Sequence, residues 1–258
     1  MFEKIKCFIL DMDGTIYLGN ELFSFTKEFL KKVDETGRKY YFFTNNSSKS
    51  QQDYIVKLER FGIRIKRQQM MTSTHVISRY LKQHYEGKSV YVVGTPSLIQ
   101  EFQYFDMNLT EEDPDIVVLG FDTTLTYEKL SKACHYIRNG CIYFGINPDW
   151  NCPMEGGAFI PDCGSIAKLI EASTGRFPEF FGKPSKHTLD YIIQETGYEP
   201  DEIAIVGDRL YTDIAVADQS DVTSILVLSG ESTREDVTTS DVKPNVILKD
   251  LSEITKML

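Results

Sequence analysis

Short runs of apolar residues recur along the chain, and each ends at a polar residue or a glycine. They occupy residues 7–10, 40–43, 90–93, 116–119, 142–144, 203–206 and 225–228. Because polar residues do not alternate with apolar ones inside these runs, the pattern favours strands that are buried on both faces of a sheet.

Between these runs, apolar residues recur at the spacing of an α-helix. The clearest stretches cover residues 25–33, 54–61 and 189–193, and a glycine follows each of them. The last stretch also has a candidate N-cap at Ser185. Strands that alternate with helices in this way predict an α/β fold built on a doubly wound, mostly parallel sheet.

One segment, residues 147–164, fits neither pattern. It is rich in Pro, Gly, Asn and Asp, and it contains the only tryptophan, Trp150. We expect a long loop here. Loops of this length in compact proteins are usually functional or disordered, and the sequence leaves both interpretations open.

Length, charge and cysteine content narrow the class of protein. The 258 residues suffice for one large or two modest domains, and the net charge of −10 disfavours nucleic acid and anionic membranes as partners. The longest apolar runs are far shorter than the roughly 20 residues of a membrane span, and we find no signal peptide. Five cysteines without a C-x-x-C pair predict reduced thiols and a cytoplasmic location.

Candidate chemistry lies where the predicted strands end. Residues 11–15 (DMDGT) follow the first apolar run, residues 44–48 (TNNSS) follow the second, and residues 207–213 (GDRLYTD) follow a later one. Lys183 stands just ahead of a predicted helix. Each feature alone is common in turns, caps and surfaces, but ligands of doubly wound sheets bind beyond the carboxyl ends of the strands. Together the segments predict one site that holds acids, a hydroxyl and a cation.

The four histidines do not extend this site. They form no metal-ligand spacing, and we interpret them as structural or surface residues: His75, His84, His135 and His187.

The set D-x-D-G-T, F-T-N-N, G-K-P-S and G-D-R-x-x-T-D resembles the haloacid dehalogenase (HAD) superfamily of phosphohydrolases. The match is best with the NagD / 4-nitrophenylphosphatase-like branch, in which YLGN and TNNSS are familiar. It extends from Asp11 to residues 233–235, and one departure is Tyr211, where the branch often has Asp. The resemblance implies a Rossmann-like core with an inserted α/β cap.

The resemblance also implies the chemistry. Asp11 would be the nucleophile that forms an aspartyl-phosphate, and Asp13, which shares its face in extended chain, would be the general acid and base. Attack on a phosphate dianion needs a hard cation, for which Mg²⁺ is the natural choice. Its implied ligands are Asp11, the Asp13 backbone carbonyl and Asp208, with Asp213 supporting them.

The phosphoryl oxygens would be held by the Thr44 hydroxyl, the Asn45 backbone N–H and the Lys183 ammonium. Gly14 would allow close backbone approach to the phosphate. Positioning and charge neutralisation are most of what phosphoryl transfer requires.

The chain between the second motif and Lys183 is too long for one or two strand–helix units. We therefore expect a core of residues 1–79 and 181–258 and a cap of residues 80–180. A homodimer formed through the cap would be consistent with the family. Asn147, Asp149 and Trp150 are our candidates for selecting the leaving group. The predicted function is Mg²⁺-dependent hydrolysis of small phosphomonoesters.

The sequence disfavours three other classes of enzyme. A P-loop NTPase would need Ser or Thr after Gly182-Lys183, where the chain has Pro184. A dinucleotide-binding enzyme would need a G-x-G-x-x-G after a strand, and the sequence has none. Asp13, as an acid for an alkoxide leaving group, favours phosphate esters over dehalogenation. A phosphotransferase and a non-catalytic phosphate-binding or signalling relative remain open.

Overall fold

The structure is a computed structural model that describes residues 2–154 and 157–258. The chain forms two units. The first contains Met1–Thr44, Ile55–Met71 and Lys183–Leu258, and the second contains Asn45–Tyr54 and Thr72–Gly182. This division differs from the expected domains in two ways: the second unit begins at residue 72 instead of residue 80, and it includes residues 45–54. Helix α3 (Ser73–His84) packs against α4 (Pro96–Tyr104), which explains the earlier start.

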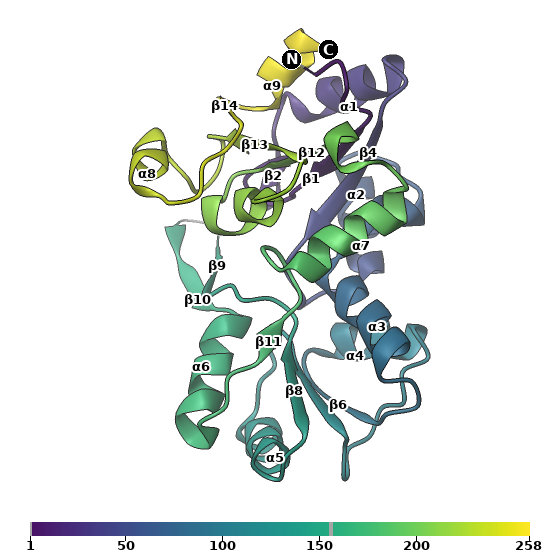
Figure 1. The fold of residues 1–258 in the computed structure, drawn as a ribbon, viewed down its shortest axis with the longest axis vertical. Helices are drawn as coiled ribbons and strands as arrows, with labels where there is room; N and C mark the ends of the chain where they lie inside the picture. The colour runs from purple at the N-terminus through teal and green to yellow at the C-terminus, as the bar shows by residue number, and fades with distance from the viewer. Residues whose placement is uncertain (1, 155–156) are drawn as a thin grey trace. The chain divides into compact units, whose positions relative to one another are not determined.

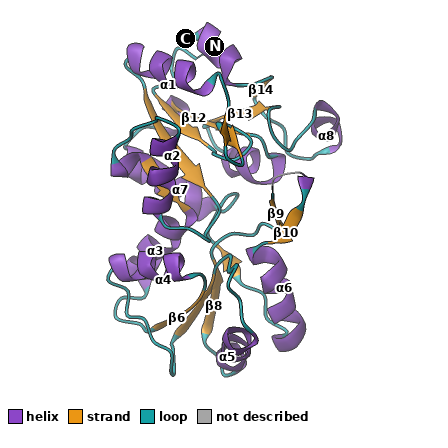
Figure 2. Ribbon diagram, turned by 180° about the vertical axis from the view of Figure 1, so that it is seen from behind, coloured by secondary structure: helices purple, strands orange, loops and turns teal. Residues whose placement is uncertain are grey.

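The first unit is built on a six-stranded sheet, whose strands are among those drawn in orange in Figure 2. Its strand order is β14-β13-β12-β1-β4-β5. The strands are β1 (Cys7–Leu10), β4 (Lys39–Thr44), β5 (Met70–Thr72), β12 (Ile203–Gly207), β13 (Thr223–Val227) and β14 (Val246–Leu248). Strand β1 is fully buried and pairs in parallel with both β4 and β12. The carboxyl ends of these three strands therefore share one edge of the sheet, and the predicted parallel α/β fold is confirmed.

The helices of the chain follow the apolar spacing. Ser185 caps α7, because its hydroxyl accepts a hydrogen bond from the His187 N–H at 3.3 Å. The helix ends at Gly197, as predicted, with a left-handed φ of 68°. Helices α1 and α9 lie side by side (Figure 1). Besides α3 and α4, the helices are α1 (Thr26–Glu35), α2 (Gln51–Arg60), α5 (Tyr127–Arg138), α6 (Cys163–Thr174), α7 (Lys186–Thr196), α8 (Arg234–Thr239) and α9 (Leu251–Met257).

The second unit has its own parallel sheet, with the order β11-β8-β7-β6. Its strands are β6 (Val90–Val93), β7 (Ile116–Leu119), β8 (Ile142–Gly145) and β11 (Glu179–Phe180). Helices α5 and α6 pack their apolar faces on it, with Ile137 and Ile170 fully buried. This core gives the unit a hydrophobic interior of its own.

Segment 147–164 is not simply a loop. Strand β9 (Asn151–Pro153) pairs with β10 (Phe159–Pro161) in an antiparallel hairpin, and α6 begins at Cys163. Residues 155 and 156, within this segment, lie outside the described residues. The high content of Pro, Gly and Asn masks the hairpin, because these residues are typical of turns.

Several short strands were not predicted. They are β5, β11, β14 and the hairpin of β2 (Tyr17–Leu18) and β3 (Glu21–Leu22). Strand β13 also ends one residue before the predicted Leu228, although the Leu228 N–H still donates to Leu248 O at 3.0 Å. Runs of two or three residues are too short to show a period.

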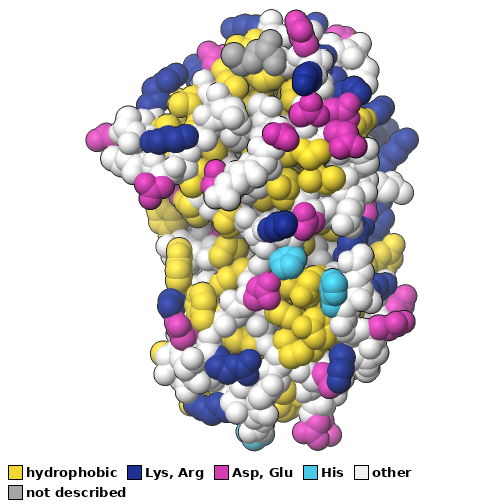
Figure 3. Space-filling view, in the orientation of Figure 1, with side chains coloured by type: hydrophobic (Ala, Val, Ile, Leu, Met, Phe, Trp, Pro, Cys, Tyr) yellow, Lys and Arg dark blue, Asp and Glu magenta, His cyan; other side chains and the backbone are white. Residues whose placement is uncertain are grey.

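In the described part of the chain, every helix is too short or too polar to span a bilayer. On the face drawn in Figure 3, basic and acidic side chains are interspersed, so no extended basic patch covers that face.

Candidate active site

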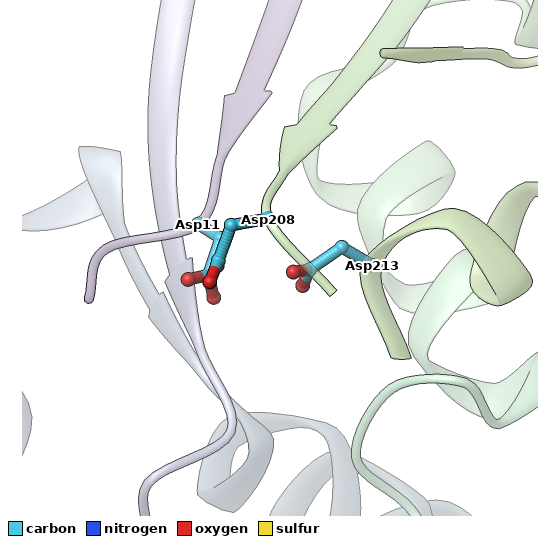
Figure 4. Close-up of side chains that lie close together, drawn as sticks. All are labelled: Asp11, Asp208 and Asp213. Carbon is cyan, nitrogen blue, oxygen red and sulfur yellow. The ribbon is translucent and has the colours of Figure 1, made fainter. Parts of the chain in front are cut away.

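Two aspartates directly follow adjacent parallel strands of the first unit, at the same edge of the sheet. Strand β1 pairs with β12 so that Leu10 lies opposite Val206, and the Asp11 N–H continues this pairing by donating to Val206 O at 2.9 Å. Asp208 follows β12 directly. The side chains of Asp11 and Asp208 consequently lie next to each other (Figure 4).

Asp213 completes an acidic cluster from a different element. It lies in a π-helical turn, Leu210–Ile214, and its Oδ2 accepts a hydrogen bond from the Arg209 N–H at 3.0 Å. One carboxylate oxygen from each of Asp11, Asp208 and Asp213 lies within 4.8 Å of the other two.

Lys183 supplies a cation to this cluster. Its ammonium lies 2.6 Å from Asp11 Oδ1 and 2.5 Å from Asp213 Oδ1, and its side chain is 2% exposed. Burial opposes the charge on Lys183, but the two carboxylates outweigh burial and raise its pKa above the ordinary value. Lys183 is therefore a permanent positive charge that holds Asp11 and Asp213 in place.

Lys183 alone does not neutralise the three carboxylates of the cluster. Burial, reinforced by Asp213 and opposed by Lys183, raises the pKa of Asp11 to about 7. Burial together with Asp213 and Asp11 also raises the pKa of Asp208. Three ionised carboxylates facing one ammonium would leave an excess of two negative charges, which a divalent cation would neutralise.

The donor atoms also suit such a cation. Asp208 Oδ2 accepts from the Glu231 N–H at 2.7 Å, whereas the buried Asp208 Oδ1 has no hydrogen-bond partner among the described residues. A buried oxygen without a partner is costly unless another ligand satisfies it. Carboxylate oxygens are the ligands that Mg²⁺ prefers, so the residues present fit Mg²⁺.

Gly14 allows the chain to pass closely over Asp208. It has a positive φ of 84°, and a Cβ at this position would lie 2.6 Å from Asp208 Cγ. The Ser229 hydroxyl donates to Gly14 O at 2.7 Å and holds the segment. Asp13, half-buried, pairs with Tyr17 in the turn that follows β1, two residues after Asp11.

Comparisons with known proteins show the family of this chain. Residues 8–108 match the haloacid dehalogenase-like hydrolases, and residues 180–254 match a second family of HAD hydrolase-like domains. An acid sugar phosphatase of Staphylococcus aureus (strain MRSA252) is 33% identical over 252 residues, which cover 97% of each chain. The chain belongs to the haloacid dehalogenase-like hydrolases.

Solved structures place this hydrolase in the predicted branch. A 4-nitrophenylphosphatase from Thermotoga maritima superposes with a TM-score of 0.95 at 42% identity, covering 99% of this chain and 98% of that one. NagD from E. coli K-12 superposes with a TM-score of 0.88 at 31% identity, covering 96% and 98%. The predicted NagD-like branch and the enzyme class, a HAD phosphatase, are confirmed.

The remaining motif residues of the hydrolase are divided between the two units. Thr44 ends β4 next to β1 and is 7% exposed. Asn45 is grouped with the second unit, where its amide donates to Asp149 Oδ2 at 2.9 Å. Asn147 and Asp149 are 0% and 4% exposed, whereas Trp150 is 49% exposed. Of the three candidates for leaving-group selection, only Trp150 is open to solvent.

The segment after β13 also contacts the site, although no sequence motif predicted its role. Glu231 pairs with Arg209 at 2.9 Å and accepts from the Tyr211 hydroxyl at 2.9 Å, beside its backbone contact to Asp208. Tyr211, the one departure from the branch pattern, therefore contacts Glu231. The apolar run at 225–228 marks another strand end, and that signal would have pointed to Ser229 and Glu231.

Proposed function

We propose that this protein is a Mg²⁺-dependent phosphatase that hydrolyses small phosphomonoesters through an aspartyl-phosphate on Asp11. The observation that carries the proposal is the buried cluster of Asp11, Asp208 and Asp213 around Lys183. The ion would be held by Asp11, Asp208 and the Asp13 backbone carbonyl, with Asp213 supporting them through Lys183 and its own charge. When bound, it supplies the positive charge that lets a carboxylate approach a phosphate dianion.

The reaction then follows from the chain's own groups. An Asp11 oxygen attacks the phosphorus atom, the ester P–O bond breaks, and Asp13 gives a proton to the leaving oxygen. Asp13 next takes a proton from a water molecule that attacks the phosphorus atom of the aspartyl-phosphate. The Asp11–phosphorus bond breaks, and inorganic phosphate and free Asp11 result.

The phosphoryl oxygens need donors throughout these steps. We assign this role to the Thr44 hydroxyl, the Asn45 backbone N–H and the Lys183 ammonium, with Gly14 leaving room for the phosphate. Lys183 is suited to it, since its two ion pairs keep the ammonium charged and aimed at Asp11. Fixed donors of this kind stabilise transferring phosphoryl groups.

The relatives suggest substrates for a first screen. Their names point to aryl phosphates and sugar phosphates. We propose Trp150 as the residue that contacts the leaving group, because its large apolar side chain is half exposed.

The family resemblance also supports a cap formed by the expected residues 80–180, which lie within the second unit, and a homodimer formed through that cap. The free state of all five cysteines supports a cytoplasmic location.

The direct test is phosphate release from 4-nitrophenyl phosphate with Mg²⁺ and with excess chelator. We expect release only with the metal, and we expect none from Asp11→Asn at unchanged circular dichroism. Asp218→Asn, at an exposed acid of the same unit, is the matched control and should retain activity. Acid-quenched enzyme should carry phosphate on Asp11 by mass spectrometry. Full activity in Asp11→Asn, or activity in chelator, would overturn the proposal.

A further inference from the structure

A buried polar network lies in the second unit. The Asn147 amide nitrogen donates to Asp149 Oδ2 and to Asp162 Oδ1, each at 2.9 Å. The Asn147 amide oxygen accepts from the Ser47 hydroxyl at 2.8 Å, and Ser47 Oγ accepts in turn from the Phe121 N–H at 2.8 Å. Asn147, Asp149, Asp162 and Ser47 are all less than 5% exposed.

These contacts set the orientation of Asn147. The NH₂ end faces two carboxylates, and the carbonyl end faces a hydroxyl. A reversed amide would place its oxygen against both carboxylates, which would lose two charge-assisted hydrogen bonds and add repulsion. Asp162 is held as well, because it caps α6 by accepting from the Cys163 N–H at 2.5 Å. The network therefore has one arrangement.

Two segments that are far apart in the sequence, at Asn45 and at Gly182, contact this network or the residue before it. Asn45 donates from its side chain to Asp149 at 2.9 Å, and its carbonyl oxygen accepts from the Ser73 hydroxyl at 2.9 Å. Gly182 donates from its N–H to Ile146 O at 2.6 Å. A Cβ on Gly182 would lie 2.8 Å from Asn45 Oδ1 and 3.0 Å from Ile146 O, so the absence of a side chain lets the stretches touch.

Both stretches lead directly into the proposed phosphate site. Asn45 is bonded to Thr44, and Gly182 is bonded to Lys183. We propose that Asn147 and Asp149 are positioning residues that anchor these two links, and so hold the Thr44 hydroxyl, the Asn45 N–H and the Lys183 ammonium where the phosphoryl group needs them. This inference rests on the proposed function, and it replaces leaving-group selection as the role of Asn147 and Asp149.

A residue that positions the phosphate site and a residue that selects the leaving group should give different results when they are replaced. Loss of an anchor weakens binding of every phosphoryl group alike, because it acts on the part that all substrates share. A misplacement of about 1 Å can cost on the order of 100-fold in rate. Loss of a residue that selects the leaving group would change the ranking of substrates instead. The Mg²⁺ carboxylates belong to the first unit, so metal affinity should not respond to the anchor.

The experiment compares Asp149→Ala and Asp149→Asn with the same changes at Asp122. Asp122 is also 4% exposed and lies in the second unit, and its carboxylate pairs with Lys129 at 2.7 Å and accepts from the Thr124 hydroxyl at 2.7 Å. Gly182→Ala perturbs the anchor from the opposite side. Titration calorimetry measures the dissociation constants of inorganic phosphate, with Mg²⁺ present, and of Mg²⁺ alone. Steady-state kinetics on 4-nitrophenyl phosphate and a sugar phosphate gives kcat and KM.

We expect Asp149→Ala and Gly182→Ala to weaken phosphate binding at least about tenfold and to lower kcat by about 100-fold on both esters. Asp149→Asn, which keeps an acceptor oxygen, should recover part of each loss. The Asp122 variants should change thermal stability but leave phosphate binding and kcat within about twofold of wild type.

Two results would overturn the proposal that Asn147 and Asp149 position the phosphate site. One is phosphate binding in Asp149→Ala that matches Asp122→Ala. The other is a change of more than about tenfold in the ratio of kcat/KM between the two esters with phosphate binding unaltered. A wild-type protein that binds phosphate but releases none from any ester would refute the proposed function, while the phosphate dissociation constants would still decide the anchor.

Discussion

Replacing Gly14 by alanine tests the metal site with the least chemical change. The methyl group has two effects. A non-glycine residue at a φ of 84° costs about 1 kcal/mol in backbone strain. The new Cβ would also lie 2.6 Å from Asp208 Cγ and closer still to Asp208 Oδ2. Ordinary contact begins at 3.4 Å, so the carboxylate must retreat by about 1 Å.

This displacement of Asp208 should weaken Mg²⁺ binding. Mg²⁺ demands near-ideal geometry at about 2.0–2.1 Å from its ligands, so a displaced Asp208 becomes a poor ligand. The retreat would also stretch the 2.7 Å hydrogen bond from the Glu231 N–H to Asp208 Oδ2. We expect phosphatase activity to fall by about 100-fold and the Mg²⁺ dissociation constant to rise.

Gly37→Ala provides the matched control. Gly37 belongs to the same unit and has a φ of 74°, but a Cβ there would meet nothing within 4 Å. Gly37→Ala should lose about 1 kcal/mol and about 2–4 °C in Tm from backbone strain alone, and Gly14→Ala should lose at least as much. Only Gly14→Ala should lose metal affinity, measured by titration calorimetry, and phosphate release at saturating Mg²⁺. If Gly14→Ala binds Mg²⁺ and turns over within threefold of Gly37→Ala, the reasoning about Asp208 is wrong.

Three further predictions concern charge and selectivity. Lys183→Ala should lower the free energy of unfolding of the metal-free protein in urea by about 3–5 kcal/mol, since it leaves two buried carboxylates uncompensated; a loss no larger than that of the exposed Lys186→Ala would contradict this. Because the pKa of Asp11 is raised to about 7, its protonated form favours the folded state at low pH, and this contribution is lost as the pH rises through about 7. Mg²⁺ needs the ionised form, so it should raise Tm more at pH 8 than at pH 5, and equal shifts would refute the assignment. Trp150→Ser should change the ratio of kcat/KM between aryl and sugar phosphates, whereas Tyr127→Ser, at another exposed aromatic residue, should not; equal losses on all esters would argue against contact with the leaving group.

The sequence by itself determined the layered fold and the placement of Asp11 and Asp208 at one edge of the sheet. Buried parallel strands need apolar side chains on both faces, so their positions are visible as short apolar runs. The residues that follow such runs must lie at the carboxyl edge of the sheet, whichever order the strands take. A motif directly after a strand is therefore placed by local pattern alone, and the HAD resemblance identified the chemistry that these motifs carry.

Tertiary structure alone decided which polar residues meet away from strand ends. Asn45 and Asp149 are 104 positions apart, and Lys183 and Asp11 are 172 positions apart. In the sequence, Asn147 and Asp149 lie in a segment rich in turn-forming residues. Only the folded chain shows that they are buried in a network with Asp162 and Ser47. Hydropathy periods report which face of an element is buried, but a hydrogen bond depends on the distance and direction between two particular atoms. No local pattern encodes that distance, so the anchor of the phosphate site could be found only in the folded chain.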